Sequence, residues 1–133
     1  VLISGLIKKE IDEKNLKFKE PEKIICPVDE AGGGKDVGPE TTKLFRNKIL
    51  GAKTIFWNGP LGKIEEKEFA VGTKELAKAI IESGAYSIVG GGETVEFVSQ
   101  LGLEEKFSHL STGGGAMLEF LSEAKLPGLE VLK

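Results

Sequence analysis

The chain has 133 residues, of which 40% are hydrophobic and 29% charged, which is the profile of one soluble globular domain with a buried core. Its net charge is −3 with Lys and Glu interleaved, so we expect no nucleic-acid partner, and its short apolar runs predict neither a membrane span nor a secretory leader. A single cysteine, Cys26, excludes an internal disulfide, favours an intracellular, cytoplasmic location, and lies in an apolar run that predicts a core position.

The first third of the chain predicts two short strands and one weakly patterned helix. Residues 1–3 are apolar and predict a strand that stops at a Ser-Gly pair. Residues 6–19 are rich in charge, and only a partial apolar face favours a helix there. Residues 23–26 predict the second strand, which a proline ends. The glycine run at 32–34 follows no strand directly, so it predicts a flexible connection.

From residue 38 onward, strand and helix patterns alternate along the chain. A helix is predicted from Pro39 to Leu50, because proline favours the first helical position and Gly51 follows as a stop. The remaining predicted elements are a strand at 53–57, a helix through Leu76–Ile81, a strand at 86–89, a helix at 93–100, a strand at 106–110 and a last helix through Met117–Leu121. This alternation predicts an α/β, Rossmann-like, doubly wound parallel sheet with right-handed crossovers.

Three of the predicted strands run into glycine-rich segments, at Trp57–Gly62, Gly90–Thr94 and Ser111–Gly115. The carboxyl ends of parallel strands share one edge of a sheet, where open α/β folds bind nucleotides and phosphates. Backbone N–H groups at a helix start, together with the helix dipole, bind anions without a cationic side chain. The alternative is that the glycines only make tight turns. Three clusters on one edge favour the phosphate-binding interpretation.

Three polar side chains near these segments have more than one interpretation. Glu93 either stabilises the N-terminus of a helix or holds Mg²⁺ carried by a nucleotide. Glu65 either accepts hydrogen bonds from a ribose or is a solvated loop acid. His109, the only histidine, is more often a structural residue than a general base in such a setting. Neither the P-loop pattern nor G-x-G-x-x-G is present, so nucleotide binding is indicated without the common motifs.

Taken together, these motifs resemble phosphoglycerate kinase, specifically the C-terminal, nucleotide-binding domain of that enzyme. The matching segments are Asp36–Thr41, Trp57–Gly62, Gly72–Thr73, Ile88–Gly92, Ser108–Ala116 and Leu126–Gly128. Residues 1–6 are similar to the strand and glycine turn beside the adenine pocket, in a form associated with archaeal members. The resemblance implies that residues 1–133 form one α/β nucleotide-binding domain, incomplete relative to the family, of a two-domain kinase.

The family transfers a phosphoryl group between 1,3-bisphosphoglycerate and ADP with Mg²⁺, a step of glycolysis and gluconeogenesis, so the resemblance implies ATP/ADP with Mg²⁺ as cofactors. Within the implied site, Gly5 and Leu61 line the adenine pocket, Glu65 binds the ribose, and Asn58 and Pro60 shape the phosphate side. The complete implied nucleotide-binding set is Gly5, Asn58, Pro60, Leu61, Glu65, Gly90, Gly91, Gly92, Glu93 and Thr94, with Glu93 also as the metal ligand. The implied catalytic residues, which meet the migrating phosphoryl group, are Thr112, Gly113, Gly114 and Gly115.

The sequence also departs from the family pattern. The metal ligand of the family is usually aspartate, and Glu93 is one methylene longer. The N-terminal domain with its basic phosphoglycerate site is missing from these residues, as is the first half of the C-terminal domain with its phosphate-binding lysine. The stretch between Gly5 and Asp36 is shorter than the family pattern, and 32–34 falls at that deletion. We therefore expect a chain that binds Mg-nucleotide, meets phosphoglycerate only with the missing domain, and has no turnover alone.

An alternative from a different class is a non-catalytic folding or assembly fragment whose glycine loops bind no ligand. The missing strands would then leave a sheet edge exposed, and an exposed edge favours self-association. Thermal melting with and without MgADP separates the two interpretations, because a ligand that binds only the folded state stabilises it.

Overall fold

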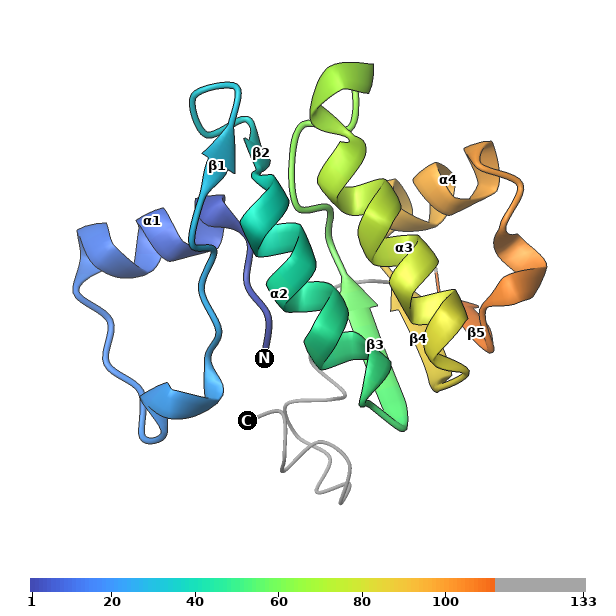
Figure 1. The fold of residues 1–133 in the computed structure, drawn as a ribbon, viewed down its shortest axis with the longest axis horizontal. Helices are drawn as coiled ribbons and strands as arrows, with labels where there is room; N and C mark the ends of the chain where they lie inside the picture. Colours follow the sequence, from blue (N-terminus) through green and yellow to red (C-terminus); the bar gives the residue numbers. More distant parts are fainter. Residues whose placement is uncertain (112–133) are drawn as a thin grey trace.

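Three parallel strands form the main sheet of the computed structural model, which describes residues 1–111 (Figure 1). They are β3 (Thr54–Asn58), β4 (Tyr86–Gly90) and β5 (His109–Ser111), in the order β3-β4-β5. β3 and β4 pair in register from Thr54 opposite Tyr86 to Asn58 opposite Gly90, and β4 pairs with β5 up to Gly90 opposite Ser111. The predicted parallel α/β architecture is confirmed.

Helices α2 (Pro39–Leu50) and α3 (Val71–Ser83) pack against each other beside the sheet, and α4 (Gly92–Gln100) follows β4 (Figure 1). α2 begins at Pro39, as predicted, because the missing N–H of proline removes no hydrogen bond in the first turn of a helix. α3 ends at Gly84, whose φ of 69° forms a left-handed cap that a residue with a side chain rarely adopts. Two 3₁₀ turns, η2 (Lys67–Phe69) and η3 (Glu104–Lys106), also lie in this part of the described chain.

The hydrophobic core lies between the sheet and its helices. Trp57 of β3 and Phe107 stack with ring centroids 6.0 Å apart and an interplanar angle of 47°, a tilted arrangement that aromatic pairs favour. The buried cluster around them consists of Ile49, Ala77, Ala79, Ile80, Val89 and Val98. The small alanine side chains at two inward positions of α3 let this helix approach the sheet closely. The rest of the cluster consists mainly of branched side chains from the strands and helices.

The N-terminal part contains α1 (Gly5–Lys14), the 3₁₀ turn η1 (Pro21–Lys23), and a hairpin of β1 (Glu30–Ala31) and β2 (Asp36–Val37). The glycines at 32–34, predicted as a connection, form the turn of this hairpin, and all three have positive φ. Ser4 caps α1 by accepting a hydrogen bond from the Ile7 N–H. The weak helical pattern at 6–19 thus corresponds to a shorter helix.

Five local predictions need correction or fall outside the described residues. The predicted strands at 1–3 and 23–26 reduce to one parallel bridge, Leu2 opposite Ile25, because η1 occupies the start of the second segment and Pro27 ends it. Cys26 is half-buried, since no long strand pair covers it. The strand predicted at 106–110 begins only at His109, after η3. The last predicted helix lies outside the described residues. No helix within residues 1–111 is long and apolar enough to cross a membrane.

Candidate functional site

The ends of the three parallel strands meet at one edge of the sheet. Asn58, Gly90 and Ser111 are in register across β3, β4 and β5, so the loops that follow these strands start side by side. Gly59 and Gly91, the next residues after β3 and β4, have φ of 92° and 94°, values that favour glycine over residues with side chains. The third loop starts at the same edge, but its candidate residues Thr112 and Gly113–Gly115 lie outside the described residues.

Buried hydroxyl groups hold the loop after β3, residues 59–62, in place. Thr94 of α4 is 1% exposed, and its hydroxyl oxygen accepts a hydrogen bond of 2.9 Å from the Gly59 N–H. Thr73 of α3 is fully buried and accepts one of 2.9 Å from the Leu61 N–H. The Trp57 indole N–H donates to the Gly59 carbonyl at 2.8 Å. Because these partners come from two helices and a strand, the loop conformation depends on the packing of all three.

The buried Asp36 carboxylate lies against Gly62 at the far end of the same loop. Asp36 of β2 is 4% exposed and accepts hydrogen bonds from the Val37 N–H at 2.8 Å and the Gly72 N–H at 2.9 Å. Burial raises the pKa of the Asp36 carboxyl, and the two N–H donors oppose that rise. A Cβ atom on Gly62 would lie 2.5 Å from the Asp36 carboxylate, so glycine is the only residue that fits this contact. Asp36 therefore joins the hairpin, the loop and the start of α3.

The start of α4 presents an open, glycine-lined surface. Gly91 is the N-cap residue, no side chain in the described part of the chain caps this helix, and Gly92 is exposed. A Cβ atom on Gly91 would lie 3.5 Å from the side-chain nitrogen of Asn58, which puts that amide beside the helix start. Backbone N–H groups exposed at a helix N-terminus, aided by the dipole, provide a site for an anion such as a phosphate.

A Mg²⁺ ion at this edge would need oxygen ligands from a molecule bound beside it. Glu93 is exposed in the first turn of α4, and no group of three acidic, His or Cys side chains is placed to hold a metal within residues 1–111. Mg²⁺ is commonly held by one or two carboxylates together with phosphate oxygens. A single exposed carboxylate beside an exposed helix N-terminus fits that donor set.

The remaining candidate residues fall around a cavity of about 580 Å³ between the N-terminal segment and β3, and they are not all brought together. Asn58, Pro60 and Leu61 line this cavity. Gly5 begins α1 directly after Ser4, which lines the same cavity from the opposite side. Glu65 lies in an exposed turn beyond the loop and does not line the cavity. The geometry thus groups the adenine and phosphate candidates and leaves Glu65 apart from them.

The sequence did not identify the buried side chains whose hydrogen bonds hold the loops of the candidate site in place. Asp36 and Thr73 lie in segments that the motif comparison marked, but their role as hydrogen-bond acceptors for Gly72 and Leu61 becomes visible only in the fold. Thr94 is placed with its hydroxyl on the Gly59 N–H rather than on the open surface. A Thr directly after a glycine at a helix start was the available signal for Thr73, and nothing in the sequence identified its partner.

A parallel sheet with glycine turns at the carboxyl ends of its strands places the chain in the class of open α/β proteins. The family model described as "Phosphoglycerate kinase" matches residues 5–124, most of the chain. The chain belongs to the phosphoglycerate kinase family. The match extends from the start of α1 past the end of the described residues, so residues 5–111 and the candidate catalytic residues 112–115 lie within the matched region.

Curated relatives and solved structures agree with this assignment. Phosphoglycerate kinase of Rubrobacter xylanophilus is 54% identical over 105 residues, which cover 79% of this chain and 27% of the relative. The enzyme of Dictyoglomus turgidum is 55% identical over 101 residues, covering 75% and 26%. The solved Pyrococcus horikoshii OT3 enzyme has a TM-score of 0.70 at 33% identity, covering 96% of this chain and 37% of that one. The Coxiella burnetii structure has a TM-score of 0.68 at 34% identity, covering 96% and 36%.

The chain therefore spans about a quarter of the length of the curated relatives that it matches. It is a fragment of the phosphoglycerate kinase fold, as the sequence predicted. The archaeal character suggested by residues 1–6 stays a prediction.

Proposed function

We propose that this chain is the C-terminal, nucleotide-binding part of a phosphoglycerate kinase, acting as one domain that binds ATP or ADP together with Mg²⁺. The observation that carries the proposal is the register of Asn58, Gly90 and Ser111, which brings the first residues of three glycine-rich segments to one sheet edge. Nucleotide phosphates are the ligands that such an edge binds in open α/β folds. Membership of a glycolytic kinase family supports the same assignment and a cytoplasmic location.

In this proposal the phosphates of the nucleotide bind the N–H groups at the start of α4, at Gly91, Gly92 and Glu93, beside Asn58. Glu93 contributes a carboxylate to the Mg²⁺ that accompanies the nucleotide, and the cation neutralises the phosphate charge during transfer. Pro60, Leu61 and Gly5 surround the adenine, and Glu65 binds the ribose after a movement of its turn. Phosphoryl transfer needs positioning and charge neutralisation more than covalent chemistry by the protein, and an edge of backbone donors supplies both.

The proposal includes the absence of turnover by the 133 residues alone. In the complete enzymes the phosphoglycerate site belongs to the N-terminal domain, and closure brings the two substrates together. The chain matches only about a quarter of such an enzyme, so we expect the acceptor to bind residues outside the matched segment. We expect residues 112–115 to meet the migrating phosphoryl group only when the other domain is present. Phosphoglycerate kinase activity of the pure chain would contradict this part of the proposal.

Thermal melting with and without millimolar MgADP tests the binding part. A ligand at ten times its dissociation constant stabilises the folded state by about 1.4 kcal/mol, which is a readily measured rise in melting temperature. Glu93→Gln should reduce the rise produced by MgADP and leave the smaller rise produced by ADP without metal unchanged. Glu96→Gln is the matched control, because Glu96 is exposed one turn along the same helix and has no proposed role.

The alternative, a folding or assembly fragment that binds no nucleotide, predicts the opposite result. It is favoured by one observation, the largely apolar cavity along the side of β3 that pairs with no other strand within residues 1–111. An unchanged melting temperature in MgADP, together with a melting temperature that rises with protein concentration, would support that alternative and exclude nucleotide binding.

A further inference from the structure

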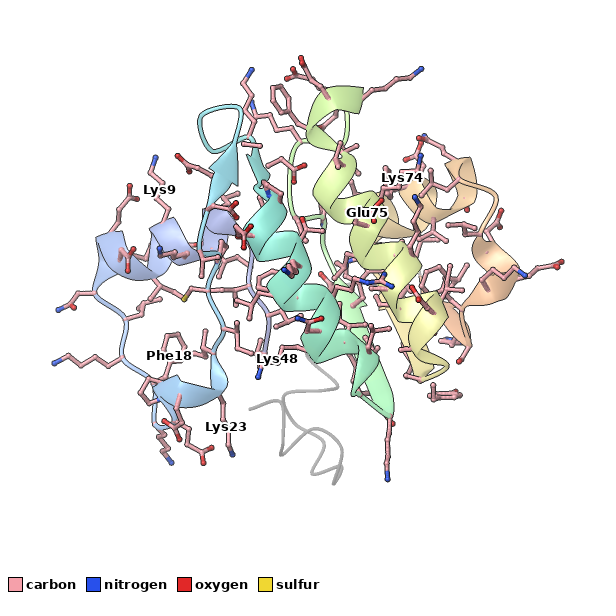
Figure 2. The ribbon with its side chains drawn as sticks, in the orientation of Figure 1. Lys9, Phe18, Lys23, Lys48, Lys74 and Glu75 are labelled. Atoms are coloured by element: carbon pink, nitrogen blue, oxygen red, sulfur yellow. The ribbon has the colours of Figure 1, made fainter. Side chains whose placement is uncertain are left out.

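Helix α3 begins without a capping side chain from its own first turn. Ala70 is its N-cap residue, and no acidic residue lies in the first turn. The charged side chains of α3 nearest to this end are Lys74 and Glu75 (Figure 2). Lys74 is exposed, and Glu75 pairs with Lys78 at 3.1 Å. Because the helix dipole disfavours a cation in the first turn, a negative group from another element would stabilise the start of α3.

Asp36 of β2 supplies that negative group. The Gly72 N–H donates to one carboxylate oxygen at 2.9 Å, and the Val37 N–H donates to the other at 2.8 Å. Cβ atoms on Gly62 and Gly72 would lie 2.5 and 2.6 Å from the same carboxylate, so it occupies a slot between two glycines. In Figure 1 the β1–β2 hairpin and the start of α3 lie at the same end of the molecule. Asp36 is therefore a cap for α3 that comes from a different element.

The residue after Gly72 carries this constraint to the candidate adenine side. Thr73 is fully buried, and its hydroxyl oxygen accepts the Leu61 N–H at 2.9 Å. Leu61 lines the 580 Å³ cavity and also borders the narrow gap between α2 and α3 that Phe45 and Ala79 line. Because Gly72 and Thr73 are consecutive in one helical turn, a shift of the Gly72 backbone moves the Thr73 hydroxyl, and Leu61 moves with it.

The phosphate side of the candidate site has a separate support. The Gly59 N–H donates to the Thr94 hydroxyl at 2.9 Å, and Thr94 belongs to α4, whose N-cap residue is Gly91. Within residues 1–111 the Asp36 side chain accepts hydrogen bonds only from Val37 and Gly72, neither of which belongs to α4. A change at Asp36 should therefore affect the adenine side and leave the phosphate side in place.

We propose that Asp36 is a positioning residue for the adenine side of the nucleotide site, and that it acts through Gly72 and Thr73 on Leu61. The inference rests on the proposed function and deepens it, because it assigns the base and the phosphates of the nucleotide to separately supported parts of the protein. Asp36 touches no nucleotide. Its carboxylate sets how the start of α3 meets the loop after β3, and thereby where the Leu61 side chain lies against the base.

Hydrogen exchange of backbone amides tests the structural half without nucleotide. Asp36→Asn keeps the size of the side chain but replaces one acceptor oxygen with an NH₂ group, so one of two buried N–H donors loses its partner. Exchange at Leu61 should become about tenfold faster relative to exchange at Gly59, whose Thr94 acceptor is unaffected. An unchanged ratio of the two rates would overturn the inference and leave the proposed function intact.

Asp29→Asn is the matched control. Asp29 caps α2 as Asp36 caps α3, since its carboxylate accepts the Glu40 N–H at 3.0 Å and the Thr41 N–H at 2.8 Å. Within residues 1–111 no hydrogen bond joins Asp29 to the loop after β3, so this change should lower the melting temperature without changing the ratio of the two exchange rates. The same change of ratio in both variants would make Asp36 a general contributor to stability and overturn the inference.

Binding of two ligands tests the functional half. The full chain is titrated calorimetrically with MgADP and with magnesium pyrophosphate, which lacks the base. Asp36→Asn should raise the dissociation constant of MgADP about tenfold and change that of pyrophosphate by less than about twofold. Thr73→Val removes the acceptor of the Leu61 N–H without touching the Asp36 contacts, so it should give the same split even if Asp36→Asn does not fold. Thr73→Ser keeps the hydroxyl and should restore most of the affinity for MgADP.

The possible outcomes are distinct. The double variant of Asp36→Asn with Thr73→Val should bind MgADP within about twofold of the weaker single variant, because both changes act on the same contact. Additive losses, or equal losses of MgADP and pyrophosphate affinity, would overturn the inference. A parent chain that binds neither ligand would contradict the proposed function itself, and the adenine role of Asp36 would fall with it.

Discussion

Replacing Gly62 with alanine tests the packing behind the candidate site. A Cβ atom at this position would lie 2.5 Å from an Asp36 carboxylate oxygen, 2.6 Å from the Phe69 carbonyl and 2.7 Å from the Lys35 carbonyl. Two of these three atoms belong to the backbone, so no side-chain rotation relieves the contact. Overpacking of this kind costs about 1–3 kcal/mol of the free energy of unfolding. Because Asp36 also accepts the Gly72 N–H at 2.9 Å, its displacement places the cost at the upper end of that range.

Urea unfolding and thermal melting measure this cost. At this chain length each kcal/mol lowers the melting temperature by about 3–5 °C, so Gly62→Ala should lower it by about 8–12 °C. Gly51→Ala is the matched control, because its nearest neighbour would be the Lys48 carbonyl at 3.9 Å and its φ is −90°. The control should change the free energy of unfolding by less than about 1 kcal/mol, in the stabilising direction. Equal stability of the parent and Gly62→Ala would refute the packing around Asp36.

Three further predictions concern Thr94 and Gly91 at the start of α4 and Asp29 beside the start of α2. Thr94→Val removes the acceptor of the Gly59 N–H and should cost about 1–3 kcal/mol in urea unfolding, whereas Thr94→Ser keeps the hydroxyl and should cost less. Gly91→Ala meets only ordinary contacts, but its φ of 94° should destabilise the chain by about 1–2 kcal/mol, and an unchanged melting temperature would contradict this. The Thr41 hydroxyl donates a hydrogen bond to the Asp29 carboxylate, which holds the pKa of that carboxyl below its usual value of 3.8. The charged form therefore stabilises the fold above this pH, and this contribution is lost as the pH falls below it. Asp29→Asn should therefore lose less melting temperature than the parent on acidification from about pH 5 to about pH 2.5, and parallel losses would contradict the assignment.

The second half of the chain was predictable because local pattern and tertiary structure agree there. Pro39 at the start of α2, Gly84 at the end of α3 and the apolar strands at 54–58 and 86–90 each have a backbone preference that the fold satisfies. The shared edge of the glycine loops also followed from sequence, since the carboxyl ends of successive parallel strands coincide.

The first third was predicted less well because local composition and the observed backbone structure disagree there. Residues 1–3 and 23–26 have the composition of strands but form a single bridge, because η1 occupies the start of the second segment and Pro27 ends it. A short strand gains most of its stability from pairing with several neighbours, and within residues 1–111 these two segments share only one bridge.

The contacts that hold the site could not be derived from pattern. Asp36 reaches Gly72, and Thr94 reaches Gly59, across 36 and 35 residues of sequence. A single sequence does not identify such pairs, because the partner of a buried polar side chain is set by which donors and acceptors the packed fold brings within reach.

Backbone amide chemical-shift mapping with MgADP tests the central claim most directly. If the loops after β3 and β4 form the nucleotide site, the amides of Gly59, Gly91, Gly92 and Glu93 should shift on addition of MgADP, and Glu93→Gln should weaken the response. The amides at the opposite end of the sheet, around Lys53 and Ala85, should not move. Saturable shifts confined to that opposite end, or no shifts at millimolar nucleotide, would contradict the site proposed for this chain.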